Sequence, residues 1–140
     1  MLGVSTFPLT NADDGSLPLP DIVDAIRFDD PHCPITSCVA LENTQNLCNG
    51  RVLSLDYVGA VAALCKERGL AFHMDGARLA NAAVALGVPL ATAASGVDSV
   101  SLCLSKGLGA PVGSILAGSG AFIHMVGTLP CVFVDVSIFE

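Results

Sequence analysis

Lys106 stands in one of the least charged stretches of this sequence. Between Leu79 and Ile123 the only other acidic or basic side chain is Asp98. A lysine among apolar residues reaches out to water, pairs with an acid, or loses part of its charge because burial lowers the pKa of an amine. In the last case the neutral amine is a nucleophile. The surroundings of Lys106 therefore leave three roles open, and the third is chemical.

Two further charged side chains lie in HMDGAR, residues 73–78. Asp75 ends an apolar run and precedes a glycine, so it either forms a turn or helix cap or holds a proton on a heteroaromatic nitrogen. Arg78 either covers a helix end or grips a carboxylate or phosphate with parallel N–H donors. An amine, a carboxylate and a guanidinium together fit a Schiff-base site, in which Lys106 binds pyridoxal phosphate and Asp75 holds its ring nitrogen.

Apolar periodicity and capping residues predict the elements that must position these side chains. One helix is expected after the turn at Asp14-Gly15, with Pro20 in the first turn of that helix. A second is expected from the N-cap Ser54 to Gly69, and a third in an alanine-rich segment that ends at Gly87. Strands are expected over residues 37–43, 70–75, 98–105 and 113–118. The first two read as fully buried strands, apolar without alternation.

Strands that alternate with helices predict an α/β fold with a mostly parallel sheet flanked by helices. In such sheets, ligands bind outside the carboxyl ends of the strands. Glu42 and Asn43 end the first strand, Asp75 ends the second, and Lys106 follows the third. The sequence therefore predicts that three strands bring polar groups to one rim.

Composition excludes several other classes of protein. The 140 residues suit one compact region, and a net charge of −7 with scattered basic residues argues against nucleic-acid binding. Glycine, proline and serine interrupt the apolar C-terminal third, so no membrane span is expected. The six cysteines form no CxxC pair, which predicts free thiols that fill the core, Cys65 and Cys103 among them, in a reducing compartment such as the cytosol, and no metal site.

Longer motifs give the sequence a family resemblance. FHMDGARLANAAVALGVPL followed by DSVSLCLSKGLGAPVGSILAG resembles the low-specificity threonine aldolases, which are pyridoxal phosphate enzymes with an aminotransferase-like fold. DDPHCP and LENTQNLCNGRVLSLDY resemble upstream motifs of the same family. The resemblance covers residues 1–122 and implies the central part of a fold type I large domain, whereas residues 123–140 form a divergent tail.

The resemblance implies a role for each matching residue. Lys106 would hold the cofactor covalently, Asp75 would pair with the pyridine nitrogen, and Arg78 would help to bind the substrate carboxylate. His32, in DDPH, matches a histidine near the substrate hydroxyl, whereas contact with water alone is the other interpretation. His73 is expected to pack within its strand on the same face as Asp75, and His124 is given no role.

Several small residues also carry expectations. The glycines after Lys106 are expected to allow close backbone packing. Gln45 replaces the family's usual histidine, and it can donate and accept hydrogen bonds without acting as a proton-transfer base. Asn49 replaces the first glycine of a pair, and because asparagine tolerates a positive φ the turn at Asn49-Gly50 should survive. The glycines concerned are Gly107, Gly109 and Gly113.

The reaction that the resemblance implies is a retro-aldol cleavage of a 3-hydroxy amino acid. Threonine or allo-threonine would give glycine and acetaldehyde, in threonine catabolism and glycine biosynthesis. Family members are homo-oligomers, with a tetramer expected, and are two to three times longer than this chain. The resemblance places the phosphate-gripping segment and the stacking histidine before Met1. It also implies a small C-terminal domain with a second carboxylate-binding arginine, which this sequence lacks, so little activity is expected of this chain alone.

Other functions remain open at this point. The chain could be a non-catalytic remnant of the family, as a fragment, an alternative product or a decayed copy. It could also be another pyridoxal phosphate enzyme, such as a β-eliminating lyase. A nucleotide-binding module is the weakest alternative, because no G-x-G-x-x-G motif opens a helix.

Overall fold

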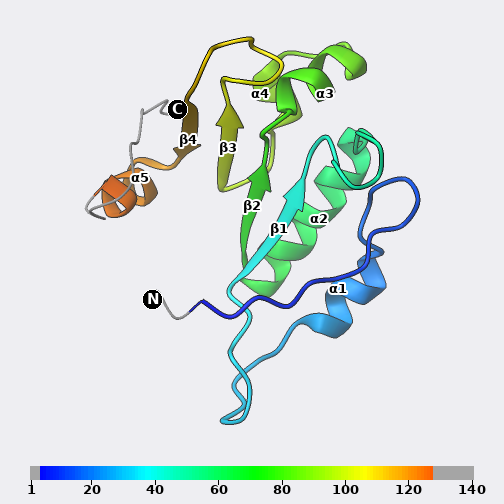
Figure 1. Ribbon diagram of the computed structural model, residues 1–140. Coiled ribbons are helices and arrows are strands. Elements are labelled where there is room, and N and C mark those ends of the chain that lie inside the picture. The colour runs from blue at the N-terminus through cyan, green and yellow to red at the C-terminus, as the bar shows by residue number, and fades with distance from the viewer. Residues whose placement is uncertain (1–3, 128–140) are drawn as a thin grey trace.

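A computed structural model of the chain describes residues 4–127. Its centre is a four-stranded sheet in the order β1-β2-β3-β4 (Figure 1). β1 pairs in parallel with β2 and β2 with β3, whereas β3 and β4 are antiparallel. The prediction of a mostly parallel α/β sheet is therefore confirmed, and the strands are β1 (Cys38–Glu42), β2 (Ala71–Asp75), β3 (Ser99–Cys103) and β4 (Ser114–Gly118).

The three predicted helices are present, and two of them have the expected caps. The Ser54 side chain accepts a hydrogen bond of 3.2 Å from the backbone N–H of Tyr57. Gly69 and Gly87 follow the second and third helices with φ of 66° and 68°, left-handed conformations that favour glycine. The helices are α1 (Leu19–Ala25), which has proline in its first turn, α2 (Leu55–Arg68) and α3 (Leu79–Leu86).

Two short helices were not predicted. α4 (Leu90–Ala93) follows Pro89, and α5 (Gly120–Gly127) follows β4. α5 runs across the boundary expected after residue 122, and Ile123 within it is 6% exposed. Residues 128–140, which make up most of the predicted tail, lie outside the described part of the chain.

The sheet has one covered face, which corrects the prediction of fully buried strands. In β1, Val39 and Leu41 are buried while Cys38 and Ala40 are exposed, and β2 follows the same alternation. The buried strand residues form one core cluster with residues of α1 to α4. Alternating burial is what a sheet shows when helices cover only one face.

The cysteines differ in their burial more than expected. Cys65 is 2% exposed, as predicted for a thiol in the core, whereas Cys103 is partly exposed and Cys38 is exposed. The five cysteines within residues 4–127 carry free thiols. Over the same residues, no helix is long and apolar enough to cross a membrane.

Candidate active site

The carboxyl ends of the three parallel strands form one rim, as predicted. Glu42 of β1 lies opposite Asp75 of β2, and Asp75 lies opposite Ser101 of β3. Lys106 follows the last residue of β3 by three positions. Since β2 and β3 are adjacent and parallel, Asp75 and Lys106 emerge at the same edge of the sheet.

Asp75 has one oxygen engaged and the other open. Its Oδ1 accepts a hydrogen bond from the backbone N–H of Ala77 at 3.0 Å, and the hydroxyl of Ser101 lies 3.5 Å from the same oxygen. Oδ2 accepts no hydrogen bond from residues 4–127, and the side chain is exposed. The turn after β2 therefore fixes the carboxylate through Oδ1 and leaves Oδ2 available to a ligand.

Arg78 is paired with an acid at this rim. Its Nη1 lies 3.6 Å from Oε1 of Glu42, and both side chains are about one-third exposed. The other oxygen of Glu42 accepts a hydrogen bond of 3.3 Å from the backbone N–H of Asn46. Arg78 is also the N-cap of α3, so backbone and side chain together hold its guanidinium at the end of β1 and β2.

Lys106 lies in an exposed turn between β3 and β4. Backbone hydrogen bonds close this turn, among them one of 2.9 Å from the N–H of Gly109 to the Lys106 oxygen and one of 2.9 Å from Ala110 to Leu104. No ion pair within residues 4–127 includes Lys106. Of the three roles that the sequence left open, exposure to water describes Lys106 in this structure.

The glycines after Lys106 serve two purposes. Gly109 has a φ of 71° with open space around its α-carbon, so it is a conformational requirement. A side chain at Gly107 or Gly113 would meet Asn81 or Leu104, respectively, so these two allow close packing as predicted. Gly113 also has a positive φ, of 118°, so it meets both requirements.

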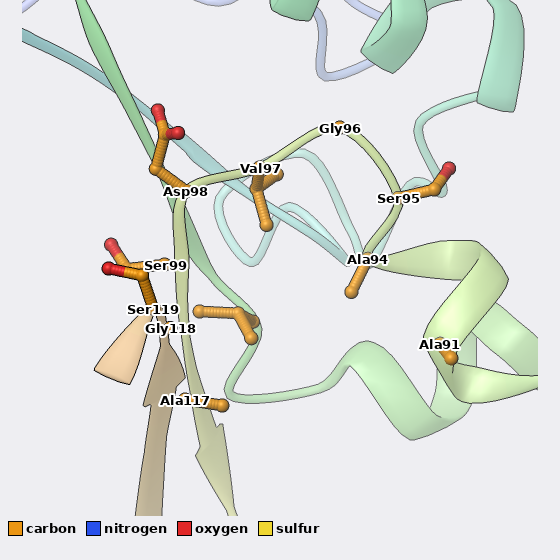
Figure 2. Close-up of a pocket in the computed structure, with 11 residues that line it drawn as sticks. Ala91, Ala94, Ser95, Gly96, Val97, Asp98, Ser99, Ala117, Gly118 and Ser119 are labelled. Carbon is orange, nitrogen blue, oxygen red and sulfur yellow. The ribbon is translucent and has the colours of Figure 1, made fainter. Parts of the chain in front are cut away.

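The two cavities described in the structure lie at the opposite end of the strands. One, of about 340 Å³, lies between the end of α4 and the adjoining ends of β3 and β4 (Figure 2). Asp98 in its wall accepts a 2.7 Å hydrogen bond from the backbone N–H of Phe72, which ties the start of β3 to β2. Neither cavity is lined by Lys106 or Asp75.

His32 is not brought to the rim. It lies in residues 28–35, which form an arm before β1, closed at its base by two hydrogen bonds between Arg27 and Thr36 of 2.9 and 3.0 Å (Figure 1). Four residue steps separate Cys38 from Glu42, so the two ends of β1 are roughly 13 Å apart. The arm that bears His32 therefore lies beyond the amino end of β1, whereas Asp75 lies at the carboxyl end of β2 (Figure 1).

His73 packs within its strand as expected. Its Nδ1 lies 2.8 Å from the hydroxyl of Ser99 on the neighbouring strand. It shares a face with Asp75 because side chains alternate along a strand. Burial lowers the pKa of His73, and the negative charge of Asp75 opposes this shift.

A buried polar loop beside the rim was only partly foreseen. Asn43 is 1% exposed, its Oδ1 accepts a 3.2 Å hydrogen bond from the N–H of Leu53, and its own N–H donates to the Asp75 backbone oxygen at 3.0 Å. Gln45 is 7% exposed and accepts a 3.0 Å bond from the N–H of Cys48. Asn49 has a φ of 58°, as predicted. The run of polar residues after an apolar strand was the signal for this loop.

Comparisons with known proteins agree with these motifs. A family model described as beta-eliminating lyase matches residues 1–129. The chain is 48% identical over 123 residues to "Probable low-specificity L-threonine aldolase 2" of Arabidopsis thaliana, which covers 86% of this chain and 35% of the relative. It is 45% identical over 116 residues to the low specificity L-threonine aldolase of Escherichia coli K12, and this match covers 83% of this chain and 34% of the relative. The chain thus spans about a third of the length of the curated relatives that it matches.

A solved structure shows the same fold. A crystal structure from Exiguobacterium sp. 255-15, named "Putative aromatic amino acid beta-eliminating lyase/threonine aldolase", aligns with a TM-score of 0.69 at 32% identity, over 84% of this chain and 31% of that one. The prediction of a partial aminotransferase-like fold is confirmed by this match.

Proposed function

The chain belongs to the beta-eliminating lyase family, and we propose that it forms the lysine-bearing part of a pyridoxal phosphate-dependent lyase that cleaves threonine or allo-threonine to glycine and acetaldehyde. The observation that supports this most directly is the emergence of Asp75 and Lys106 from adjacent parallel strands at one edge of the sheet. The relatives named threonine aldolases support the choice of reaction.

The residues at the rim fit the proposed cofactor. Lys106 offers an exposed amine for the cofactor aldehyde, and the open Oδ2 of Asp75 offers an acceptor for a protonated ring nitrogen. When bound, pyridoxal phosphate supplies an electron sink for the electron pair released at the substrate α-carbon. The part of Asp75 in this chemistry is to keep a proton at the ring nitrogen, because a carboxylate stabilises the charged form of a neighbouring base.

Arg78 is proposed to bind the carboxylate of the 3-hydroxy amino acid. A guanidinium can hold a carboxylate through two parallel hydrogen bonds. The ion pair with Glu42 keeps this guanidinium at the rim before substrate arrives. Binding then requires that the substrate carboxylate share or replace the contact with Glu42.

His32 is proposed to receive the proton of the substrate hydroxyl through a water molecule. Its position in the arm of residues 28–35, before the amino end of β1, separates it from the rim of its own copy by about the length of that strand. We therefore propose that the arm serves a second copy in a homo-oligomer, expected to be a tetramer. The exposed Phe28 and Ile35, each 60% exposed, support a protein contact for the arm. A cytosolic location is proposed from the free thiols of the described cysteines.

Two alternatives are retained because specific observations favour them. A non-catalytic role is favoured by the exposed turn of Lys106 and by the absence of Lys106 and Asp75 from the walls of the two described cavities. A β-elimination reaction is favoured by the description of the matching family model.

Reduction with borohydride in the presence of pyridoxal phosphate tests the proposal. We expect a visible absorbance band that borohydride abolishes, with the label at Lys106 in peptide maps and no label in Lys106→Ala. The matched control is Lys66→Ala, which removes a lysine from the last turn of α2 and should label normally. Label at Lys66 in place of Lys106 would contradict the cofactor role. A normal label at Lys106 with no cleavage of allo-threonine above the rate measured for Lys106→Ala would favour the non-catalytic alternative.

A further inference from the structure

Asp75 and Lys106 are each followed by a glycine, and each glycine lies against the element that adjoins the other residue in the chain. A side-chain carbon on Gly76 would lie 2.8 Å from the backbone oxygen of Ser101 and 2.8 Å from Cγ2 of Val100. Ser101 and Val100 belong to β3, the strand that leads to Lys106. The chain just after Asp75 therefore packs directly on β3, at a distance that only glycine permits.

The second contact is the counterpart of the first. A side-chain carbon on Gly107 would overlap Oδ1 of Asn81 and would lie 3.6 Å from Cβ of Ala80. Ala80 and Asn81 belong to the first turn of α3, which follows Asp75 in the chain. The turn that carries Lys106 is thus in contact with the helix positioned by the end of β2.

We propose that Gly76 and Gly107 are positioning residues that together set the separation between Asp75 and Lys106. Gly76 fixes the end of β2 against β3, and Gly107 fixes the Lys106 turn against α3. The inference rests on the proposed function, because this separation matters for a ligand that is bonded to Lys106 and paired with Asp75.

The atoms that oppose a side chain at Gly76 are held more rigidly than those at Gly107. We therefore expect alanine to have the larger effect at Gly76. At Gly76 the obstacle is the backbone oxygen of Ser101, which moves only if β3 moves. At Gly107 the obstacle is the end of the Asn81 side chain, which can rotate away. Neither glycine has a φ in the left-handed region, so alanine at either position is opposed by the neighbouring atoms and not by backbone strain.

Alanine substitutions test the proposal through cofactor uptake. Each variant is titrated with pyridoxal phosphate, reduced with borohydride and digested, and the label at Lys106 is quantified. Because displacements below 1 Å matter in such sites, we expect the half-saturating concentration to rise on the order of tenfold in Gly76→Ala and about threefold in Gly107→Ala. Gly107→Ala combined with Asn81→Ser should return close to the wild-type value, because the overlapping amide is gone.

The matched control is Gly59→Ala in α2. Gly59 has no atom within 4 Å of an added side-chain carbon, so this variant should label like the wild type. Wild-type labelling by a folded Gly76→Ala chain would overturn the proposal. If Gly76→Ala does not fold, the Gly107 and Asn81 variants decide, and failure of Asn81→Ser to restore labelling would overturn it.

A measurement without cofactor separates this inference from the proposed function. Urea unfolding of Gly107→Ala, Asn81→Ser and the double variant forms a double-mutant cycle. Residues in contact should be coupled by at least about twofold in the unfolding equilibrium constant. Absence of coupling would overturn the contact and with it the positioning role. Coupling without any label at Lys106 in the wild type would instead overturn the proposed function, and the two failures are therefore distinguishable.

Discussion

The two oxygens of Asp75 have different surroundings. Oδ1 accepts a hydrogen bond from the N–H of Ala77, whereas Oδ2 of this exposed residue accepts none from residues 4–127. Asn43, one residue beyond β1, donates its N–H to the Asp75 backbone oxygen. The position of this carboxylate therefore depends on the turn after β2 and on a buried asparagine from the adjacent strand.

Asn43→Ala should lower the free energy of unfolding by about 1–3 kcal/mol, because it leaves the buried N–H of Leu53 without an acceptor. Urea denaturation measures this change. Asn46→Ala, in the same loop but exposed, is the matched control and should stay within about 0.5 kcal/mol of the wild type. Equal losses in both variants would show that the amide of Asn43 is not a structural acceptor.

The free energy of unfolding should decrease as the pH falls below about 6.5, with His73 as one cause. Burial lowers the pKa of His73, so the unfolded chain binds a proton in a pH range where the folded chain does not. Stability from this group is thus present above the unfolded pKa and is lost as the pH falls through the lowered folded pKa. His73→Gln should reduce the slope of stability against pH over this range. An unchanged slope would exclude His73 as a source.

At the scale of helices and strands, the sequence predicted the helix ends better than it predicted which strand residues are buried. α2 begins after Ser54 and ends at Gly69, and α3 ends at Gly87, as expected. These ends were predictable because capping depends on residues that are neighbours in the chain. α4 was missed because four residues are too few to show a helical period. The exposure of Cys38 and Ala40 was missed because a sequence does not show whether helices cover one face of a sheet or both.

The candidate site was also predictable in part: the sequence predicted which residues lie at the strand ends but not the tertiary contacts between them. The order of strands and the residue at each strand end placed Glu42, Asp75 and Lys106 at one rim. The pairing of Arg78 with Glu42 and the position of the His32 arm depend on tertiary contacts, which no spacing in the sequence shows.

Ser54→Ala should destabilise the chain by about 1 kcal/mol, because the first turn of α2 loses its side-chain acceptor. Thermal or urea denaturation measures the loss. Ser95→Ala removes an exposed hydroxyl beyond the end of α4 and should be close to neutral. A neutral Ser54→Ala would mean that tertiary packing alone holds the start of α2.

At the scale of the whole molecule, the 140-residue chain should have at least about 100-fold less threonine aldolase activity than a full-length relative. The chain spans about a third of those relatives, and Lys106 stands in an exposed turn, so a bound substrate would be loosely oriented. A coupled assay for acetaldehyde from allo-threonine, with added pyridoxal phosphate, measures this. Turnover close to that of the Escherichia coli enzyme, and lost in Lys106→Ala, would contradict the expectation.

The sheet also has a seam between β2 and β3. β1 and β2 are paired along their full length, as are β3 and β4. The ladder between β2 and β3 covers His73 to Asp75 and Ser99 to Ser101, with two further hydrogen bonds between Asp98 and Phe72 beside it. Asp75 and Lys106 stand on opposite sides of this seam. Local opening would therefore part the two residues while each half of the sheet keeps its own ladder, and amide hydrogen exchange should be fastest across the seam. A ligand that bridges Asp75 and Lys106 would therefore also stabilise the contact between the β1–β2 pair and the β3–β4 pair.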